Sequence, residues 1–387
     1  MVINDAIKLE VISDHNMPSS IESIELGKDT LLSKFNASHL IRGKDFDEVF
    51  FDSPYGQIQV LIQGKKKCTP FVTFHDLGLN GFVQYTGFFA SEEMEKIMEH
   101  FCVYHITAPG QHENAKTIAH DAKYPTMDEM ADIIDYAIGY FKQVIVIGIG
   151  IGMGGHIMAE AALFYPNRFI AIITINCITS VCGWAEWANT KLMKFHLRHN
   201  TVDATVINSL LYHHIGNEVM QSKPDLAKMY YEYFATNLHA VNFQRLLDSF
   251  VNRTALNIER DTENSSTIEC SVMNVVGDYS PHLDEAVEFN GQLNPKTSTF
   301  VKLSECGGLV LDEQPDKFAE SLMYFLQGLG YVCNLNVSKE SLSSRLHHKI
   351  MGERITSQYS RARSKTTMLN PTQSSMSFSQ QGIPKEV

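Results

Sequence analysis

A cluster of glycines at residues 148–155 carries the clearest chemical signal in the sequence, because its spacing matches the turn that presents a nucleophile in many hydrolases. An apolar run at 144–147 predicts a strand before the turn, and residues 156–164 predict a helix after it. Strand, sharp turn and helix form the frame of the nucleophile elbow, Gly-x-Ser-x-Gly, which exposes a catalytic serine. Gly152 occupies the serine position. Glycine has no hydroxyl group, so the elbow is predicted without its nucleophile.

The same glycines allow a second interpretation, since Gly150, Gly152 and Gly155 also fit Gly-x-Gly-x-x-Gly, a turn that binds a dinucleotide pyrophosphate. That use normally requires an acidic residue at the end of the next strand, where it binds the ribose. The next predicted strand, 169–175, is followed by Asn176 and Cys177. The missing carboxylate favours the elbow, and we predict no cofactor.

The other two triad positions follow from chain order, because the acid and then the histidine come after the nucleophile in this class of hydrolase. Asp278 comes soon after the predicted strand 270–276 and is the candidate acid. The histidine normally precedes a Glu-x-Pro sequence, which lies here at 313–315, and its position is occupied by Gly308. Neither Gly152 nor Gly308 can transfer a proton. We therefore predict a pseudoenzyme without hydrolytic activity.

Several residues near the predicted elbow are candidates to line a pocket. His75 and Asp76 follow the predicted strand 70–74, at the place where hydrolases commonly carry His-Gly beside the oxyanion hole. A carboxylate at that place would repel a developing oxyanion. The candidate pocket residues are His75, Asp76, Gln111, Gly152, Met153 and His282.

An enzymatic alternative is a thiol nucleophile, with Cys177 acting beside His282. A buried core thiol and a surface histidine are the plainer interpretation. The sequence has seven cysteines, scattered and without CxxC spacing, which favours reduced thiols in a cytoplasmic protein over disulfides or a zinc site. We predict no metal site.

The elements that must position these residues predict an α/β-hydrolase fold with a mostly parallel sheet flanked by helices. A hairpin is predicted at 46–63, and strands at 70–74, 101–106, 169–175, 270–276 and 299–303 alternate with helices such as 94–100, 127–140, 281–293 and 315–328. Four helices without a strand, at 184–195, 202–212, 224–233 and 241–251, predict a helical cap over about 178–262. Residues 1–45 predict a loosely ordered extension, 46–330 the hydrolase-like domain, and 331–387 a disordered tail.

Charge is distributed unevenly along the chain. Residues 331–387 contain eight Lys or Arg and three acidic residues, a net of +5, which leaves about −17 for residues 1–330 because the whole chain is −12. An acidic body argues against nucleic acid as a partner. A basic tail suits regulation or contact with an anionic surface. No apolar run reaches the roughly 18 residues that span a bilayer, and no secretory signal is evident.

Residues 48–330 resemble the N-myc downstream-regulated (NDR or NDRG) family, which are inactive relatives of the α/β hydrolases. The resemblance is carried, in order, by segments 74–80, 108–111, 124–128, 183–188, 276–278 with 281–282, and 324–331. It implies a cytoplasmic, non-enzymatic adaptor or binding module that acts in signal transduction, stress response, differentiation or vesicle trafficking, with protein partners. Family members carry kinase sites in a Ser/Thr-rich tail. This tail lacks long tandem repeats, so the family's repeat-linked metal binding is not expected here.

The tail contains Arg361 and Arg363 followed by Ser364 and Thr366, which fits the Arg-x-Arg-x-x-Ser/Thr pattern of basophilic kinases. We predict that a serum- or glucocorticoid-type kinase modifies Thr366, with Ser364 as the second candidate. Phosphate would add about −1.5 to −2 charge to a positive tail. A third function class is a lipid or membrane-surface binder that uses the cap crevice and this basic tail, with peripheral association.

Overall fold

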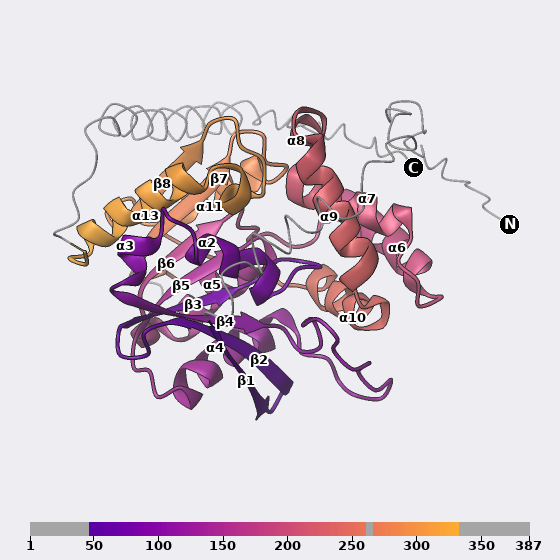
Figure 1. Cartoon of the computed structure of the whole chain (residues 1–387), viewed down its shortest axis with the longest axis horizontal. Coiled ribbons are helices and arrows are strands. Elements are labelled where there is room, and N and C mark those ends of the chain that lie inside the picture. Colours follow the sequence, from indigo (N-terminus) through magenta and orange to yellow (C-terminus); the bar gives the residue numbers. More distant parts are fainter. Residues whose placement is uncertain (1–45, 261–265, 333–387) are drawn as a thin grey trace, which may run out of the picture.

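The computed structural model describes residues 46–260 and 266–332, and one eight-stranded sheet organises them (Figure 1). The strand order is β1-β2-β4-β3-β5-β6-β7-β8. The strands are β1 (Phe46–Ser53), β2 (Gly56–Gly64), β3 (Thr69–Phe74), β4 (Phe101–Thr107), β5 (Val146–Ile151), β6 (Phe169–Ile175), β7 (Ser271–Gly277) and β8 (Ser298–Leu303). The pairs β1–β2 and β2–β4 are antiparallel, and every later pair is parallel. The predicted α/β-hydrolase fold with a mostly parallel sheet is confirmed.

Apolar residues cover both faces of the sheet, which explains why its central strands are almost continuous apolar runs. Every residue of β4 and β5 is buried. Alternate side chains enter different cores: Val72 of β3 packs on one face and its neighbour Phe71 on the other. The faces are covered by α2 (Gly87–Phe89), α3 (Glu95–Met98), α4 (Met127–Tyr140), α5 (Met153–Phe164), α11 (Leu283–Gln292), α12 (Val310–Glu313) and α13 (Pro315–Gly328).

The helix α4 matches its predicted bounds because its start is specified locally. Thr126 accepts the N–H of Glu129, whose side chain accepts the N–H of Thr126, and this reciprocal capping box satisfies two amide donors at the helix start. Two other predictions were less accurate. The helix expected at 94–100 covers only α3, and the π-helical turn Phe82–Thr86 followed by α2 was not predicted.

Five helices form the cap between β6 and β7, at the carboxyl ends of the parallel strands (Figure 1). They are α6 (Trp184–Leu197), α7 (Ala204–Ile215), α8 (Asn217–Ser222), α9 (Pro224–Asn237) and α10 (Ala240–Val251). The short α8 was not predicted. Arg253, just after α10, binds the Glu186 carboxylate of α6 through two N–H groups, each 2.7 Å from a carboxylate oxygen. This bidentate pair joins the beginning and the end of the cap.

The predicted extension 1–45 and most of the predicted tail lie outside the described residues, as do Ser364 and Thr366. Among the helices of the described ranges, none combines the length and apolar character needed to cross a membrane.

Candidate functional site

The predicted elbow is present, and Gly152 lies at its apex between β5 and α5. Its φ of 54° and ψ of −115° lie in a region that is strained for residues with a Cβ atom. The strand begins at Val146, two residues later than the apolar run suggested, and includes Gly148 and Gly150. A Cβ on Gly150 would lie 2.1 Å from the carbonyl oxygen of Gly154. The glycines of the strand therefore allow α5 to approach β5 closely.

The side chain of Asp76 occupies the space in front of the elbow. One carboxylate oxygen, Oδ1, accepts the N–H of Leu77 at 2.8 Å and the N–H of Met153 at 2.9 Å. In α/β hydrolases the residue after the nucleophile and a residue in the loop after β3 donate the N–H groups of the oxyanion hole. Met153 and Leu77 hold these positions, so Asp76 presents a carboxylate oxygen where a substrate oxyanion would bind.

The same carboxylate explains why residue 152 is glycine. A Cβ at Gly152 would lie 2.1 Å from Oδ2 of Asp76, well inside van der Waals contact. The side chain of Asp76 thus takes both the oxyanion position and the space that a nucleophile would need. The sequence predicted repulsion of an oxyanion by this residue; the structure adds that the carboxylate itself binds the two donors.

The loop that carries Asp76 is held by buried hydrogen bonds. His75 is completely buried and accepts the N–H of Ala108 at Nε2, at 2.9 Å, so its Nδ1 carries the proton and donates to the carbonyl of Asp76 at 2.8 Å. Burial lowers the pKa of His75 to about 4, which keeps the ring neutral. The N–H of Asp76 donates to the side chain of Gln84 at 2.7 Å. His75 is therefore a positioning residue for Asp76 and does not line an open pocket.

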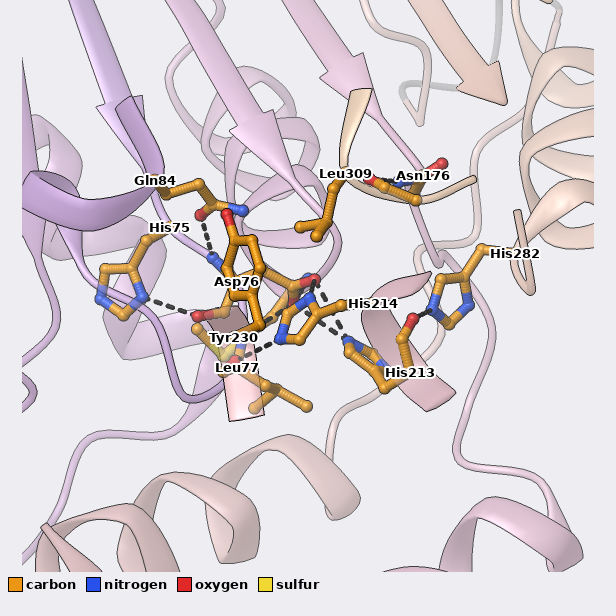
Figure 2. A network of polar contacts seen from close by, with 12 residues as sticks. His75, Asp76, Leu77, Gln84, Asn176, His213, His214, Tyr230, His282 and Leu309 are labelled. Atoms are coloured by element: carbon orange, nitrogen blue, oxygen red, sulfur yellow. Dashed lines mark hydrogen bonds and ion pairs between the residues drawn. The ribbon is translucent and has the colours of Figure 1, made fainter. Parts of the chain in front are cut away.

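Two adjacent histidines of α7 approach Asp76 from the cap (Figure 2). Nε2 of His213 lies 3.2 Å and 3.3 Å from the two carboxylate oxygens, and Nδ1 of His214 lies 3.4 Å from Oδ2. Nε2 of His214 bonds the carbonyl oxygen of Leu77 at 2.8 Å. Sequence reasoning missed this pair, although two consecutive histidines near the end of a predicted apolar helix were a signal.

Burial and pairing oppose each other in this cluster. Burial alone would raise the pKa of Asp76, but the charge interaction with His213 and the hydrogen bonds from His213 and the Met153 N–H hold that pKa well below its usual value. Burial alone would lower the pKa of His213, but the Asp76 carboxylate raises it above its usual value. Burial lowers the pKa of His214 to about 4. The buried Asp76 carboxylate is therefore paired mainly with His213.

The residues at the other two predicted triad positions, Asp278 and Gly308, make structural contacts. Asp278 accepts the N–H of Cys306 at 3.2 Å and so orders the loop after β8. A Cβ on Gly308 would lie 2.1 Å from the carbonyl oxygen of His214, so the cap backbone fills the space of the triad histidine. His282 donates from Nε2 to the carbonyl of His213 at 3.0 Å. Glycine at both 152 and 308 is thus required by close packing.

Two further sequence candidates lie in other settings. Cys177 is completely buried, and burial raises the pKa of its thiol far above the usual value, which disfavours a nucleophilic thiolate. The imidazole of His282 is directed at His213, so the structure lends no support to a Cys177–His282 dyad. Gln111 donates to the carbonyl of Asn242 at 3.0 Å and ties the loop after β4 to α10.

Comparison with known proteins identifies a family and related sequences. Residues 48–333 match the Ndr family. Protein NDRG3 of Xenopus tropicalis is 34% identical over 325 residues, which cover 82% of this chain and 81% of that protein. Protein NDRG4 of the same organism is 31% identical over 322 residues, which cover 82% and 78%.

Among solved structures, a thermophilic esterase from Thermogutta terrifontis aligns with a TM-score of 0.57 at 16% identity, over 73% of this chain and 99% of that one. An enol-lactonase from Burkholderia xenovorans LB400 aligns with a TM-score of 0.58 at 13% identity, over 72% and 100%. At such low identity these likenesses establish the fold alone.

Proposed function

The chain belongs to the Ndr family, and on that premise we propose that it is a non-catalytic cytoplasmic protein that acts as a binding module in signal transduction, stress response, differentiation or vesicle trafficking. The observation that carries the proposal is the Asp76 carboxylate, which accepts the two N–H groups that an acyl-transfer enzyme directs at its substrate. A fixed negative charge at this position opposes the oxyanion that ester hydrolysis must form. The protein retains the scaffold of a hydrolase and uses it for recognition.

The absence of hydrolysis is tested with a fluorophosphonate probe and a panel of short- and long-chain aryl esters, with an active serine hydrolase as the positive control. We expect no labelling and no turnover above the Cys177→Ala variant. Gly152→Ser should also remain inactive, because its side chain would meet the Asp76 carboxylate. Turnover by pure wild-type protein that disappears in Cys177→Ala would overturn the proposal in favour of a thiol enzyme.

The surface that best suits a protein partner is the outer face of α6. Trp184 is 87% exposed and Phe195 58% exposed, and Trp187 lies beside Trp184 with ring centroids 6.1 Å apart. Aromatic residues are enriched at interfaces, and tryptophan often dominates their binding energy. An exposed cluster of this kind supports a partner that covers α6.

This surface is tested by quantitative affinity capture with the full chain. Trp184→Ala combined with Trp187→Ala should remove a defined set of partners while leaving the melting temperature within a few degrees of wild type. Phe164→Ala is the matched control, because Phe164 is an aromatic residue of α5 that is 51% exposed on another surface. Equal capture by all three proteins would exclude α6 as the partner surface.

The tail supplies a regulatory input in this proposal. A serum- or glucocorticoid-type kinase is proposed to phosphorylate Thr366, supported by Arg361 and Arg363 in the sequence before it. In vitro phosphorylation followed by peptide mapping should place most of the phosphate on Thr366. Unchanged incorporation in Thr366→Ala would remove this assignment, and incorporation lost only in Ser364→Ala would move it to Ser364.

Contact with an anionic lipid surface is a second candidate, favoured by basic side chains next to the aromatic residues of α6. Nζ of Lys191 lies 5.3 Å from the ring centre of Trp187, and the guanidinium of Arg198 lies 5.5 Å from that of Phe195. Aromatic and basic residues together suit a membrane interface. Salt-sensitive co-sedimentation with phosphatidylserine vesicles, reduced when the chain ends at residue 330, would support it; equal binding by the shortened chain would exclude the tail.

A further inference from the structure

We propose that Asp76, His213 and His214 form a binding site for a divalent transition-metal ion, with zinc as the expected metal, between the cap and the sheet. The site goes beyond the proposed binding role and does not depend on it. One ligand atom from each residue lies within 4.8 Å of the others. The scattered cysteines led to the prediction of no metal site, and these three residues were not connected because Asp76 lies 137 residues before His213.

The spacing of the donor atoms suits a tetrahedral ion. Zinc binds imidazole nitrogen and carboxylate oxygen at about 2.0–2.2 Å, so two ligands of a tetrahedral ion lie roughly 3.3–3.5 Å apart. Oδ2 of Asp76 lies 3.2 Å from Nε2 of His213 and 3.4 Å from Nδ1 of His214. The carboxylate therefore stands at the separation from each imidazole that such an ion requires, and all three donor atoms lie within 4.8 Å of one another. A tetrahedral ion held by these three ligands would have a fourth position for water.

The proton positions around His214 strengthen the inference. The carbonyl oxygen of Leu77 can only accept, so Nε2 of His214 must carry the proton in their 2.8 Å bond. In a neutral imidazole Nδ1 then has a lone pair, which lies 3.4 Å from the Oδ2 oxygen of Asp76. These two acceptors face each other in a buried site, and a cation bound to both would remove their mutual repulsion. A metal ion satisfies both groups without a second protonated imidazole.

The neighbours of the three ligands are arranged as they are in known metal sites. A ligating histidine commonly donates its other ring N–H to a backbone carbonyl, as His214 does to Leu77. The Oδ1 oxygen of Asp76 is fixed by the N–H groups of Leu77 and Met153. The Oδ2 oxygen faces both histidines and is the one that would bind the metal. His213 is partly exposed, with 17% of its side chain accessible, and gives the ion a route of entry. Imidazole ligands favour zinc, copper or nickel over calcium and magnesium.

The test uses tag-free full-length protein, stripped with a chelator and titrated with Zn²⁺ by isothermal titration calorimetry. We expect one site per chain. Asp76→Asn and His213→Gln should each weaken binding by more than about 100-fold, because even changes in the surrounding hydrogen bonds cost 10–100-fold in metal sites. Substitution by Co²⁺ should give the visible absorption of a tetrahedral ion with nitrogen and oxygen ligands.

The matched control is His196→Gln, which removes an imidazole from the His196–Asp203 pair elsewhere in the cap. This variant should bind zinc as wild type does. His213→Gln is the more tolerant of the ligand variants because His213 is the most exposed ligand, and its folding is checked by circular dichroism. Zinc should also raise the melting temperature of wild type and not that of His213→Gln. Absence of a stoichiometric site, or equal affinity in wild type and His213→Gln, would overturn the proposal.

Discussion

Two buried carboxylates in this domain have opposite charge states, and the difference shows what a buried acid needs in order to remain ionised. Asp76 accepts two backbone N–H groups and faces His213, and its pKa is held below the usual value. The Oε2 atom of Glu160, in α5, lies 3.9 Å from Nε2 of His156. Neither Oε2 of Glu160 nor Nε2 of His156 has a hydrogen-bond partner. Burial and then the charge of Asp128 raise the pKa of Glu160 to about 8.

The pKa values of Asp76 and Glu160 differ because only Asp76 has hydrogen-bond donors fixed beside its carboxylate. His156 bonds the carbonyl of Ile178 through Nδ1, so the Nε2 atom that faces Glu160 is an acceptor, and burial lowers the pKa of His156 to about 4. Glu160 therefore gains no positive partner and keeps its proton at neutral pH. Asp76 has fixed amide donors from the elbow itself. The two N–H groups that would donate to an oxyanion in a hydrolase donate here to a side-chain carboxylate.

The largest expected effect comes from removing the stabilised charge. Asp76→Ala leaves His213 without its counter-ion and two buried N–H groups without an acceptor. Breaking a buried pair in this way typically costs about 3–5 kcal/mol, and urea unfolding would measure the loss. Asp76→Asn retains an acceptor oxygen and should lose less. A loss under about 1 kcal/mol in Asp76→Ala would mean that the donors are satisfied by water and that the contrast with Glu160 is false.

A smaller loss is expected where the elbow is forced to accept a side chain. Gly152→Ala combines a positive φ with a Cβ placed 2.1 Å from Asp76, and should cost about 2–4 kcal/mol. Gly139→Ala in α4 is the matched control: nothing lies within 4 Å of its Cβ, and it should be neutral or stabilise by up to about 1 kcal/mol. In the double variant with Asp76→Gly the cost should be less than additive. If the stability losses of Gly152→Ala and Asp76→Gly added exactly, the new Cβ at residue 152 would not be clashing with the Asp76 carboxylate.

The smallest effect concerns Glu160 and appears as a change in pH dependence. Its folded pKa of about 8 lies above the usual 4.5, so the folded state binds more protons and stability falls as pH rises between these values. Glu160→Gln removes this dependence. It should match wild type near pH 5 and exceed it by on the order of 2 kcal/mol or more at pH 8, because the shift from 4.5 to about 8 corresponds to about 1.4 kcal/mol for each pH unit. Parallel stability curves for the two proteins from pH 5 to 8 would show that Glu160 ionises normally.

Much of the scaffold could be predicted because its signals are local. The elbow, the cap helices and the helix α4 each depend on local spacing along the chain, and the glycines at 152 and 308 exclude a serine–histidine pair at those positions whatever the packing. The short helices α2 and α8 escaped prediction because a few residues carry too little periodicity. The helix predicted at 94–100 shortened to α3, which has only four residues.

What the sequence determined by itself was the absence of a serine and a histidine at positions 152 and 308, since residue types are a matter of composition. What only the tertiary structure decided was the replacement: Asp76 in the oxyanion position, with His213 and His214 brought to it from the cap. The contact depends on how α7 packs over the strand ends. That packing is set by many weak apolar contacts across the whole domain, and no local pattern in the chain records it.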